Sequence, residues 1–553
     1  MLPLAVLLPE PGLPGLRRRD LRRVVLIAAT PLARVANVPS ARTAMSWIAI
    51  AAAYVAVAKV GLGFASLTKS VTLVWPASGL ALAALFALGT GAWPAVALGA
   101  FAVNVTTPGV GPLVAAGIAA GNTLEAVAGA ELLRRARFDR AMTRIGDVLR
   151  LVALAAITST AVSASLGVAA LAAGGLVSAS AAPAVWRTWW LGDAMGDLVF
   201  APLLLVVLST TSALPSRARA AELAAFTIAL VVVTLSIFGV APKIGGFPQT
   251  YVVFPLLTWA ALRFGVLGTA ASNVVVSAIS VYATANARGE FVRATLNESL
   301  FNLQAFMAVT VITALLLAAA VAERDRAIAL RDDFLALASH ELATPLTAIE
   351  LDVASLSRML ARGDAPEEKV KRRAAHTEQQ VQRLKGLVVR LLDSSRLAAG
   401  RLALDVAPLD LAELARSAAE PFTVELAAAG RALTVDAPEP VRGAWDRARL
   451  EGVLTNLLSN AVKFGADSAV RVTVRAEPDF AILRVEDGGP GVDVAARARV
   501  FERFERAASS AHHPGVGLGL WIARGLVDAM GGTITLSDAD PKGAAFTVKL
   551  PRG

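Results

Sequence analysis

The sequence predicts three successive folds: a polytopic α-helical membrane domain, a helical hairpin that forms a four-helix bundle in a dimer, and an α/β sandwich. Its 553 residues are 56% hydrophobic and only 17% charged, whereas soluble domains carry roughly 25% charged residues. Apolar runs near the roughly 20 residues that span a bilayer occupy the chain from residue 46 to 321. Beyond them the apolar residues change first to heptad spacing and then to strand-like alternation.

The net charge of +10 divides unevenly along the chain. Residues 1–320 hold 22 Lys and Arg against 11 Asp and Glu, whereas residues 321–553 hold the remaining 31 against 32. The positive excess therefore belongs to the apolar half, as the positive-inside rule predicts for a protein in a lipid bilayer, and we expect no nucleic-acid partner. The absence of Cys excludes disulfides, thiolate zinc sites and cysteine nucleophiles.

We expect a basic tail over residues 1–45 and a multi-span membrane domain over residues 46–322. The predicted spans are 46–66, 73–91, 93–107, 113–132, 148–175, 188–208, 221–241, 251–264, 266–284 and 301–321. The third and eighth are short, so the count lies between eight and ten. Arginine clusters in the tail, at 134–144 and at 217–219 fall on one side if all ten cross, which places both termini in the cytoplasm.

Ionisable groups inside a bilayer are costly and usually line a cavity or a pathway. Asp193 and Asp197 are four residues apart in one predicted span, so their carboxyl groups share a helix face. They either anchor the helix near an interface or face the bundle interior as a polar input site paired with Lys59 or Arg187. Other polar residues within predicted spans are Glu125, Asn104 and Asn122.

Two heptad segments predict the helical hairpin over residues 323–400. Apolar residues step by four and three from Leu342 to Leu360 and again from Val370 to Leu391. One hairpin has too small a core to stand alone, so we expect a homodimer that buries both apolar seams in a four-helix bundle. About ten residues separate the last predicted span from the helix that carries His340, so a shift of that span would reach this helix directly.

Residues 403–553 predict the α/β domain. Strand-like runs occupy 433–436, 469–476, 481–487, 533–537 and 545–550, and helices are expected at 410–428, 446–463 and 516–530.

The first candidate site is the string Ser339–Leu346 on the first hairpin helix. His340 lies two positions before Leu342 and therefore points away from the apolar seam. A carboxylate beside an exposed imidazole, here Glu341, can accept its proton and make the ring a nucleophile. Pro345 removes a backbone hydrogen bond and is expected to bend the helix. The alternative is an ordinary surface histidine, the reading we also give to His376, His512 and His513.

The second candidate site is a helix face that carries Asn456, Asn460 and Lys463 at positions i, i+4 and i+7. Mg²⁺ prefers oxygen ligands and a Lys ammonium neutralises phosphate oxygens, so this face suits a magnesium triphosphate. The alternative is a solvated helix face.

Two glycine-rich strings follow. Asp487 ends a predicted strand before Gly488-Gly489-Pro490-Gly491, where its carboxylate can accept a hydrogen bond from an exocyclic amine such as that of adenine. The second string, Gly515–Leu520, opens a predicted helix, and such loops bind phosphate through free N–H groups. Either string alone is weak evidence, because glycines also make turns. The order of all four motifs is the strong signal.

In this order the motifs resemble those of sensor histidine kinases over about residues 325–551. Ser339–Leu346 resembles the phospho-acceptor box, but has Ala343 where a basic residue is common. Asp487–Val492 resembles the first glycine box, but has Gly488 where Asn is frequent. The N, F and second glycine boxes correspond to Asn456–Phe464, Phe501–Phe504 and Gly515–Leu520. The resemblance implies an α/β sandwich of the histidine kinase and Hsp90-like type for residues 403–553.

The resemblance implies that His340 takes the γ-phosphoryl group of ATP, that Glu341 acts as general base, and that Thr344 orients water when a phosphorylated partner is dephosphorylated. The residues implied for Mg²⁺-ATP are Asn456, Asn460, Lys463, Asp487, Gly489, Gly491, Gly515, Gly517, Leu518 and Gly519. Among them Asn460 would hold Mg²⁺ and Asp487 would read the adenine amine, under a lid formed by residues 493–514. Because the sequence ends at Gly553, the acceptor is expected to be a separate response regulator with a receiver domain.

The membrane half resembles the first type of membrane-associated sensor domain in Val74–Leu80 and Trp189–Asp197. Together the resemblances imply a multi-pass protein of the bacterial inner membrane with a cytoplasmic kinase domain. A transporter would explain the spans but not the four ordered boxes. An ATPase of the same nucleotide fold would lack the His340 string, whereas a protein that acts mainly as a phosphatase would use the same residues.

Overall fold

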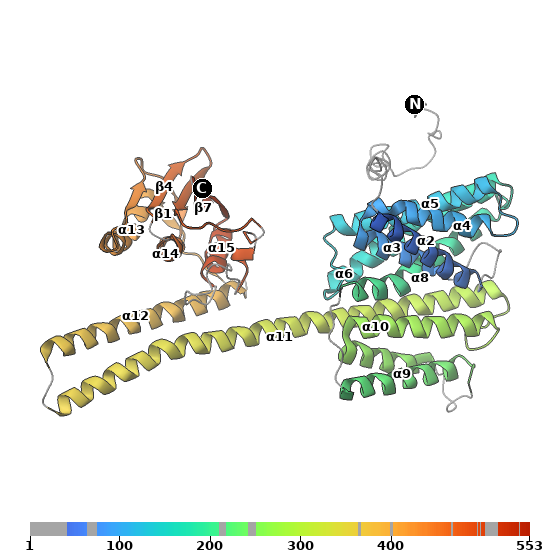
Figure 1. The fold of residues 1–553 in the computed structure, drawn as a ribbon, viewed down its shortest axis with the longest axis horizontal. Coiled ribbons are helices and arrows are strands. Elements are labelled where there is room, and N and C mark those ends of the chain that lie inside the picture. Colours follow the sequence, from blue (N-terminus) through green and yellow to red (C-terminus); the bar gives the residue numbers. More distant parts are fainter. Residues whose placement is uncertain are drawn as a thin grey trace. The chain divides into compact units, whose positions relative to one another are not determined.

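The computed structural model describes residues 41–63, 74–209, 217–241, 250–362, 366–398, 402–465, 468–494, 496–497, 499–503, 518–540 and 542–552. The chain divides into two compact units, Met1–Ile328 and Ala329–Gly553. The first unit is helical, and the second holds a helical hairpin and a mixed α/β domain (Figure 1). Most of the basic tail predicted for residues 1–45 lies outside the described residues, and the first described helix begins at Ala41 rather than at residue 46.

The longer helices that the structure describes in the membrane unit are α2 (Ala41–Leu62), α3 (Pro76–Leu88), α4 (Trp93–Val105), α5 (Pro112–Arg135), α6 (Ile145–Arg150), the π-helix η3 (Leu151–Ser159), α7 (Thr160–Ala173), α8 (Ala182–Val207), α9 (Arg217–Ile237), α10 (Val253–Ala285) and the first part of α11 (Leu296–Ala361). Every predicted span overlaps one of them. Across the described residues, seven helices are long and apolar enough to cross a membrane. At 1.5 Å per residue, α3 and α4 are too short to span the roughly 30 Å hydrocarbon core alone.

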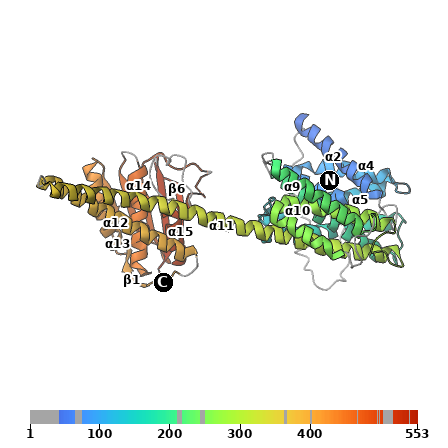
Figure 2. The ribbon, with the colours of Figure 1, turned by 90° about the horizontal axis from the view of Figure 1, so that it is seen from below.

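Helix α10 contains the two segments predicted on either side of residue 265. Gly265 has a non-helical backbone with φ of 63°, and it makes a kink between two helical stretches. A positive φ of this kind is readily adopted only by glycine, so the residue type fixes the position of the kink. Figure 2 shows α9, α10 and the first part of α11 lying side by side in this unit.

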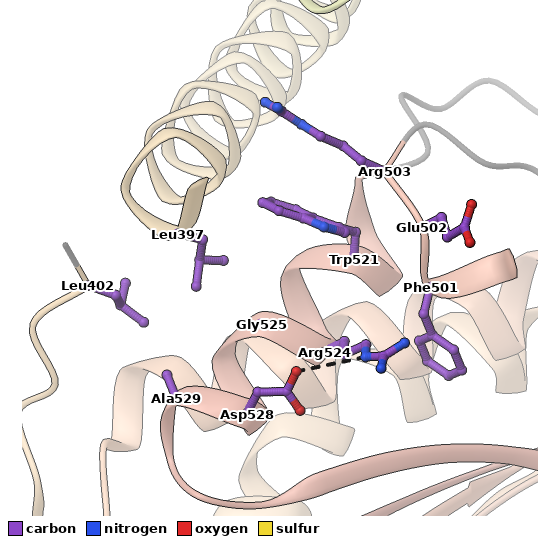
Figure 3. A pocket seen from close by; sticks show the side chains of 10 residues that line it. All are labelled: Leu397, Leu402, Phe501, Glu502, Arg503, Trp521, Arg524, Gly525, Asp528 and Ala529. Atoms are coloured by element: carbon purple, nitrogen blue, oxygen red, sulfur yellow. Dashed lines mark ion pairs between the residues drawn. The ribbon is translucent and has the colours of Figure 1, made fainter. Parts of the chain in front are cut away.

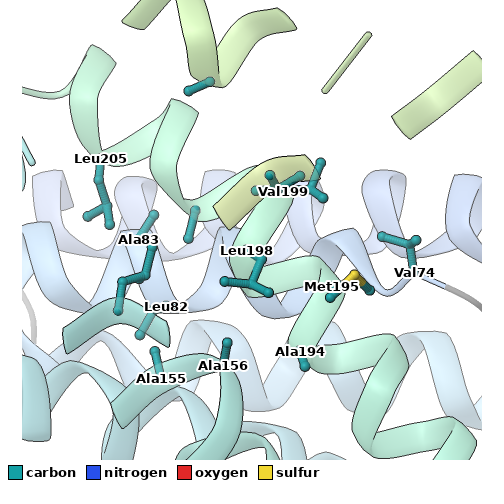
Figure 4. Close-up of a cluster of buried hydrophobic side chains, with 14 of the residues drawn as sticks. Val74, Leu82, Ala83, Ala155, Ala156, Ala194, Met195, Leu198, Val199 and Leu205 are labelled. Carbon is teal, nitrogen blue, oxygen red and sulfur yellow. The ribbon is translucent and has the colours of Figure 1, made fainter. Parts of the chain in front are cut away.

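The core of the membrane unit forms where α3, η3 and α8 meet. Leu82 and Ala83 of α3, Ala155 of η3 and Leu198 of α8 are among its buried side chains (Figure 4). Glycines allow α3 and α8 to approach closely: a Cβ on Gly196 would lie 2.0 Å from the backbone oxygen of Trp75, the residue before α3. The two sequence strings singled out in this half therefore lie directly against each other.

Helix α11 differs from the prediction in its length. We expected a connection of about ten residues between the last span and the hairpin, but α11 is one 66-residue helix that continues through Pro345. The expected bend at this proline does not end the helix, because Pro345 removes only one of the many backbone hydrogen bonds. The last span and the helix that carries His340 are thus one element.

The second helix of the hairpin is α12 (Glu367–Ala398). Asp352 of α11 is buried and joins the two helices, because Arg373 donates to its Oδ1 at 2.5 Å and His376 Nδ1 pairs with its Oδ2. His376 is exposed, as predicted, and it also pairs with Asp352. The predicted seam is only partly covered: Leu346 and Leu360 remain 48% and 66% exposed.

The α/β domain is built on a five-stranded sheet in the order β2-β4-β5-β7-β6. Its strands are β2 (Leu433–Asp436), β4 (Val470–Ala476), β5 (Phe480–Glu486), β6 (Thr533–Asp538) and β7 (Ala544–Pro551), and only β2 and β4 pair in parallel. Helices α13 (Leu411–Ala428), α14 (Arg447–Phe464) and α15 (Gly519–Ala529) pack on the sheet. This arrangement confirms the predicted two-layer sandwich.

The prediction missed a second, two-stranded sheet. Strands β1 (Ala407–Asp410) and β3 (Arg442–Trp445) pair antiparallel. Asp410 also begins α13 by accepting the N–H of Ala412 at 2.9 Å, and Asp446 begins α14 by accepting that of Arg449 at 3.1 Å.

Candidate nucleotide and phosphorylation site

The candidate phospho-acceptor His340 is exposed on α11, as its position relative to the heptad predicts. The hydroxyl of Thr344, one turn further on, donates to the His340 carbonyl oxygen at 3.1 Å. Glu341 follows directly and is half-buried, whereas Pro345 is buried. The imidazole is thus accessible to a nucleotide and has a carboxyl group as its neighbour in the chain.

The candidate adenine-reading residue Asp487 follows β5 and is 7% exposed. Its Oδ1 accepts the N–H of Gly489 at 2.9 Å, and its own N–H donates to the Ala544 carbonyl at 3.0 Å, so the loop after β5 and the strand that begins at Ala544 hold it in place. Burial raises the pKa of the Asp487 carboxyl above its ordinary value, and the backbone N–H groups and Arg431 offset only part of this rise. The hydrogen bonds that the described residues make to the Asp487 side chain go to Oδ1, so Oδ2 is left as an acceptor for a ligand amine.

The first glycine box and the end of α14 touch each other. A Cβ on Gly489 would lie 2.3 Å from the Phe464 carbonyl oxygen, and one on Gly465 would lie 3.1 Å from the Asp487 Cβ. Only glycine permits these approaches, so Gly489 is required by packing as well as by any ring bound beside it. Gly491 has φ of 74°, which also favours glycine.

The N box and the second glycine box are also brought together. A Cβ on Gly519, the first residue of α15, would lie 2.2 Å from Asn456 Oδ1. The Asn456 Nδ2 atom is buried and has no hydrogen-bond partner in the described part of the chain. Asn460 is half-buried one turn along α14, Lys463 is exposed near its end, and Leu518 is buried before α15. A glycine packed against the Asn456 side chain and an unpaired amide fit a bound Mg²⁺-nucleotide.

Some predicted residues lie outside the described part of the chain. They are Gly515, Gly517, His512, His513 and most of the predicted lid. The described lid residues include the short helix η5 (Arg499–Phe501).

Two residues that organise this site were missed by sequence reasoning. Arg431 donates to the Val462 and Ser468 carbonyl oxygens at 3.0 and 2.9 Å, and so it caps the C-terminal end of α14. Gly543 has φ of 127°, and a Cβ there would lie 1.8 Å from the Asp487 carbonyl oxygen. The position of Gly543 before the last strand is a turn signal, but nothing in the sequence indicates the role of Arg431.

A cavity of about 650 Å³ lies at another place, where α12 meets α15 (Figure 3). Leu397, Trp521 and Arg503 are among its lining residues. The Arg503 guanidinium lies 4.8 Å from the ring centroid of Phe334 and 5.3 Å from that of Trp521. This cavity contains none of the predicted nucleotide residues, so it belongs to the contact between the hairpin and the α/β domain.

The polar residues of the membrane unit distinguish the two interpretations given above. Asp193 and Asp197 are 2% and 1% exposed, so they face the bundle interior and are not interface anchors. The prediction that Lys59 or Arg187 pairs with these aspartates is wrong. Lys59 donates to Thr106 at 2.8 Å, and the Arg187 guanidinium lies over the Phe301 ring. These basic side chains lie elsewhere because each reaches a partner of its own.

Three family models match the chain: MASE1 over residues 47–325, the His Kinase A (phospho-acceptor) domain over 330–400, and the histidine kinase-, DNA gyrase B- and HSP90-like ATPase over 445–553. A helical membrane sensor unit, a phospho-acceptor hairpin and an ATPase sandwich together define a membrane-bound sensor histidine kinase of a two-component system. The MASE1 match covers half of the chain, and the chain belongs to the MASE1 family.

Relatives share only part of this architecture. The chain is 35% identical over 236 residues to the sensor protein KdpD of Mycobacterium tuberculosis (strain CDC 1551 / Oshkosh), covering 41% of this chain and 26% of KdpD. It is 37% identical over 239 residues to the probable sensor histidine kinase TcrY of Mycobacterium tuberculosis (strain ATCC 25618 / H37Rv), covering 42% of this chain and 49% of TcrY. The chain thus spans between a quarter and a half of these curated relatives.

Among solved structures, full-length ShkA in complex with AMPPNP is 33% identical. The match covers 39% of this chain and 45% of ShkA, with a TM-score of 0.32.

Proposed function

We propose that this protein phosphorylates itself on His340 with Mg²⁺-ATP and passes the phosphoryl group to an aspartate of a response regulator, under control of the membrane domain. The observation that carries the proposal is an exposed histidine beside a carboxyl group on the hairpin, in the same chain as a sandwich that assembles the N box against both glycine boxes. In this proposal the domains are residues 1–45, 46–322, 323–400 and 403–553, with the kinase half on the cytoplasmic side of a bacterial inner membrane.

In the proposed reaction a ring nitrogen of His340 attacks the γ-phosphorus atom of ATP. A nitrogen–phosphorus bond forms, the bond from the γ-phosphorus to the bridging oxygen breaks, and ADP leaves. The Glu341 carboxylate accepts the proton that the imidazole loses. Thr344 is placed one turn further on, where it would orient water for the reverse, phosphatase activity toward the regulator.

The nucleotide would lie where α14, the Asp487 loop and the start of α15 converge. Asp487 would accept the adenine amine, with Gly489 and Gly491 beside the ring. Asn460, supported by Asn456, would hold Mg²⁺, which neutralises phosphate charge. Lys463, Gly515, Gly517, Leu518 and Gly519 would surround the phosphates.

The dimer proposal is supported by the partly exposed seam of the hairpin. Leu346, Val353 and Leu360 on α11 are each about half-exposed or more in one chain. A second hairpin that covers these side chains would remove their apolar surface from water, at roughly 25 cal/mol per Å² buried. The four-helix bundle is therefore the assembly that this face favours.

The experiment uses membranes that contain the full chain and γ-labelled ATP. We expect label that is labile in acid and stable in base, as a phosphohistidine is, and we expect His340→Gln to lose it while it still binds ATP. His376→Gln is the matched control on the same hairpin and should keep the label. Label that survives in the His340 variant, or vanishes in the His376 variant alone, would overturn the assignment.

A further inference from the structure

A cluster of three carboxyl groups is buried in the membrane unit, away from the kinase machinery. Glu125 comes from α5, and Asp193 and Asp197 come from successive turns of α8; all three are at most 2% exposed. The Glu125 carboxyl interacts electrostatically with those of both aspartates. Three acidic side chains from two helices thus share one enclosed space.

Polar side chains from the surrounding helices enclose the cluster. Ser78 of α3 donates to Asp193 Oδ1 at 3.2 Å. A chain of hydrogen bonds runs beside it, from the Trp189 indole to Ser163 at 3.1 Å, from Ser163 to Asn122 at 2.9 Å and from Asn122 to the Tyr54 hydroxyl at 3.0 Å. These contacts position the site but leave part of it unsatisfied.

The unsatisfied atoms are carboxylate oxygens. Both oxygens of Asp197, Oδ2 of Asp193 and Oε2 of Glu125 are buried without a hydrogen-bond partner among the residues described. A buried carboxylate without a partner is strongly destabilising, and proteins normally compensate it with a positive charge or a proton. Asp197 in particular is buried in the bundle, and neither of its oxygens has a hydrogen-bond partner in the part of the chain that the structure describes.

No basic side chain of the surrounding helices supplies that charge. Helices α3, η3 and α7 contain no ionisable residue, and α5 has its arginines at its far end. On α2, the only titratable neighbour that joins the network is Tyr54, since Lys59 donates to Thr106. On α10, Arg263 is paired with Glu222 at 2.6 Å. Arg187, on α8 itself, lies over the Phe301 ring.

We propose that Glu125, Asp193 and Asp197 form a binding site for one small monovalent cation within the membrane domain. The ligand is specified by its single positive charge, which a proton, an alkali metal ion or ammonium can supply. In the described residues no three acidic or imidazole groups could ligate a metal ion together, so the cation is held mainly at Asp197, whose two oxygens both lack a partner there.

The site is placed to influence the helix that leaves the membrane unit. Leu198 and Val199, next to Asp197 on α8, belong to the same buried apolar cluster as Leu303 and Met307 of α11. A change of charge at Asp197 would alter the packing of this cluster, and α11 is the helix that carries His340. This consequence for kinase output rests on the proposed function, whereas cation binding does not.

The binding experiment measures the thermal unfolding midpoint of the purified full chain in lipid nanodiscs. The midpoint is followed against pH at fixed salt, and against sodium, potassium and ammonium chloride that replace N-methylglucamine chloride at fixed ionic strength. We expect one arm to stabilise the protein by several degrees, because a ligand that binds only the folded state raises the midpoint. A rise on acidification alone identifies a proton, and a rise with one salt identifies that ion.

The decisive variant is Asp197→Asn, which keeps the size of the side chain but removes the charge. We expect it to lose the ligand-dependent rise. Glu131→Gln is the matched control, since this residue lies on α5 but pairs with Arg135 near the surface, and it should respond like the parent. If Asp197→Asn does not fold, Glu125→Gln replaces it with the same expectation. A parent chain that responds to no arm, or a variant that responds in parallel with it, overturns the proposal.

The output experiment separates this proposal from the proposed kinase activity. Autophosphorylation of the parent chain and of Asp197→Asn is compared with and without the effective cation. We expect the cation to change the parent's rate and not the variant's, with equal ATP affinity. A cation-dependent unfolding midpoint without any phosphorylation would sink the kinase proposal alone, whereas phosphorylation without any cation response would sink the cation site alone.

Discussion

The substitution Asp487→Asn tests the nucleotide site most directly, because it separates the structural role of this residue from its proposed role in binding. In the structure Oδ1 accepts the Gly489 N–H at 2.9 Å, and an asparagine can keep that bond through its own carbonyl oxygen. The other position changes from an acceptor to an N–H donor. A donor there would face the donor amine of adenine, so the fold should persist while nucleotide binding weakens.

The magnitude follows from the contacts that are lost. A hydrogen bond to a charged group contributes about 1.5–3 kcal/mol, and leaving a buried donor unpaired costs about 1–3 kcal/mol. Every 1.4 kcal/mol corresponds to about a tenfold change in Kd. We therefore expect ATP affinity to fall by about tenfold or more in Asp487→Asn. Asp487→Ala should show a similar loss and should also lower stability, because the Gly489 N–H loses its acceptor.

The assay is a titration of the full chain with a fluorescent ATP analogue, alongside thermal unfolding. Glu486→Gln serves as the control, since this neighbouring side chain is held by Arg484 and takes no part in the proposed site. The pKa of Asp487 is raised by burial, so the parent's ATP affinity should decline on acidification at a higher pH than for an ordinary aspartate. Unchanged affinity in Asp487→Asn would refute the assignment of the adenine site.

Two further predictions concern α14 and the hairpin. Asn460→Asp should abolish magnesium-dependent autophosphorylation, because a carboxylate beside the phosphates repels them; rates measured over a range of Mg²⁺ concentrations test this, and a parental Mg²⁺ dependence would contradict it. Asp352→Asn should destabilise the hairpin at neutral pH. His376 and Arg373 hold the pKa of Asp352 below its ordinary value, so its contribution is present above the unfolded pKa and is lost as pH falls through the folded one. Thermal unfolding of parent and variant should therefore converge in acid, and a constant difference would refute this linkage.

The α/β domain was predictable because its apolar patterns are local. The five strands of the main sheet and its three helices each have a distinct sequence period, and the structure places them within a few residues of the prediction. Strands β1 (Ala-Pro-Leu-Asp) and β3 (Arg-Gly-Ala-Trp) were not predicted, because neither shows the alternation of apolar and polar residues that is visible in the equally short β2. Strand β1 precedes α13 and β3 follows it, so their pairing joins distant parts of the chain and cannot be seen in a local sequence pattern.

The site was predictable in its motifs but not in its supports. Asp487 and Asn456 belong to short strings whose residue types indicate their chemistry. Arg431 and Gly543 act through the carbonyl oxygens of other elements, and such contacts become visible only after folding. The same is true of the membrane unit. The four-residue spacing of Asp193 and Asp197 predicts that they share a helix face, but it does not predict that Ser78 of α3 donates to Asp193.

Two of the buried acidic sites of this protein show why burial alone does not define a carboxyl group's role. Asp487 accepts the N–H of Gly489, and it lies at the mouth of a site whose ligand is expected to bring a neutral amine donor. A few oriented N–H groups are enough to stabilise the buried Asp487 carboxyl group. Among the described residues Asp197 has no N–H or O–H donor on either oxygen, and its neighbours Glu125 and Asp193 are also acidic. Only a positive charge can balance that cluster, so the difference in backbone partners leads to a different ligand at each site.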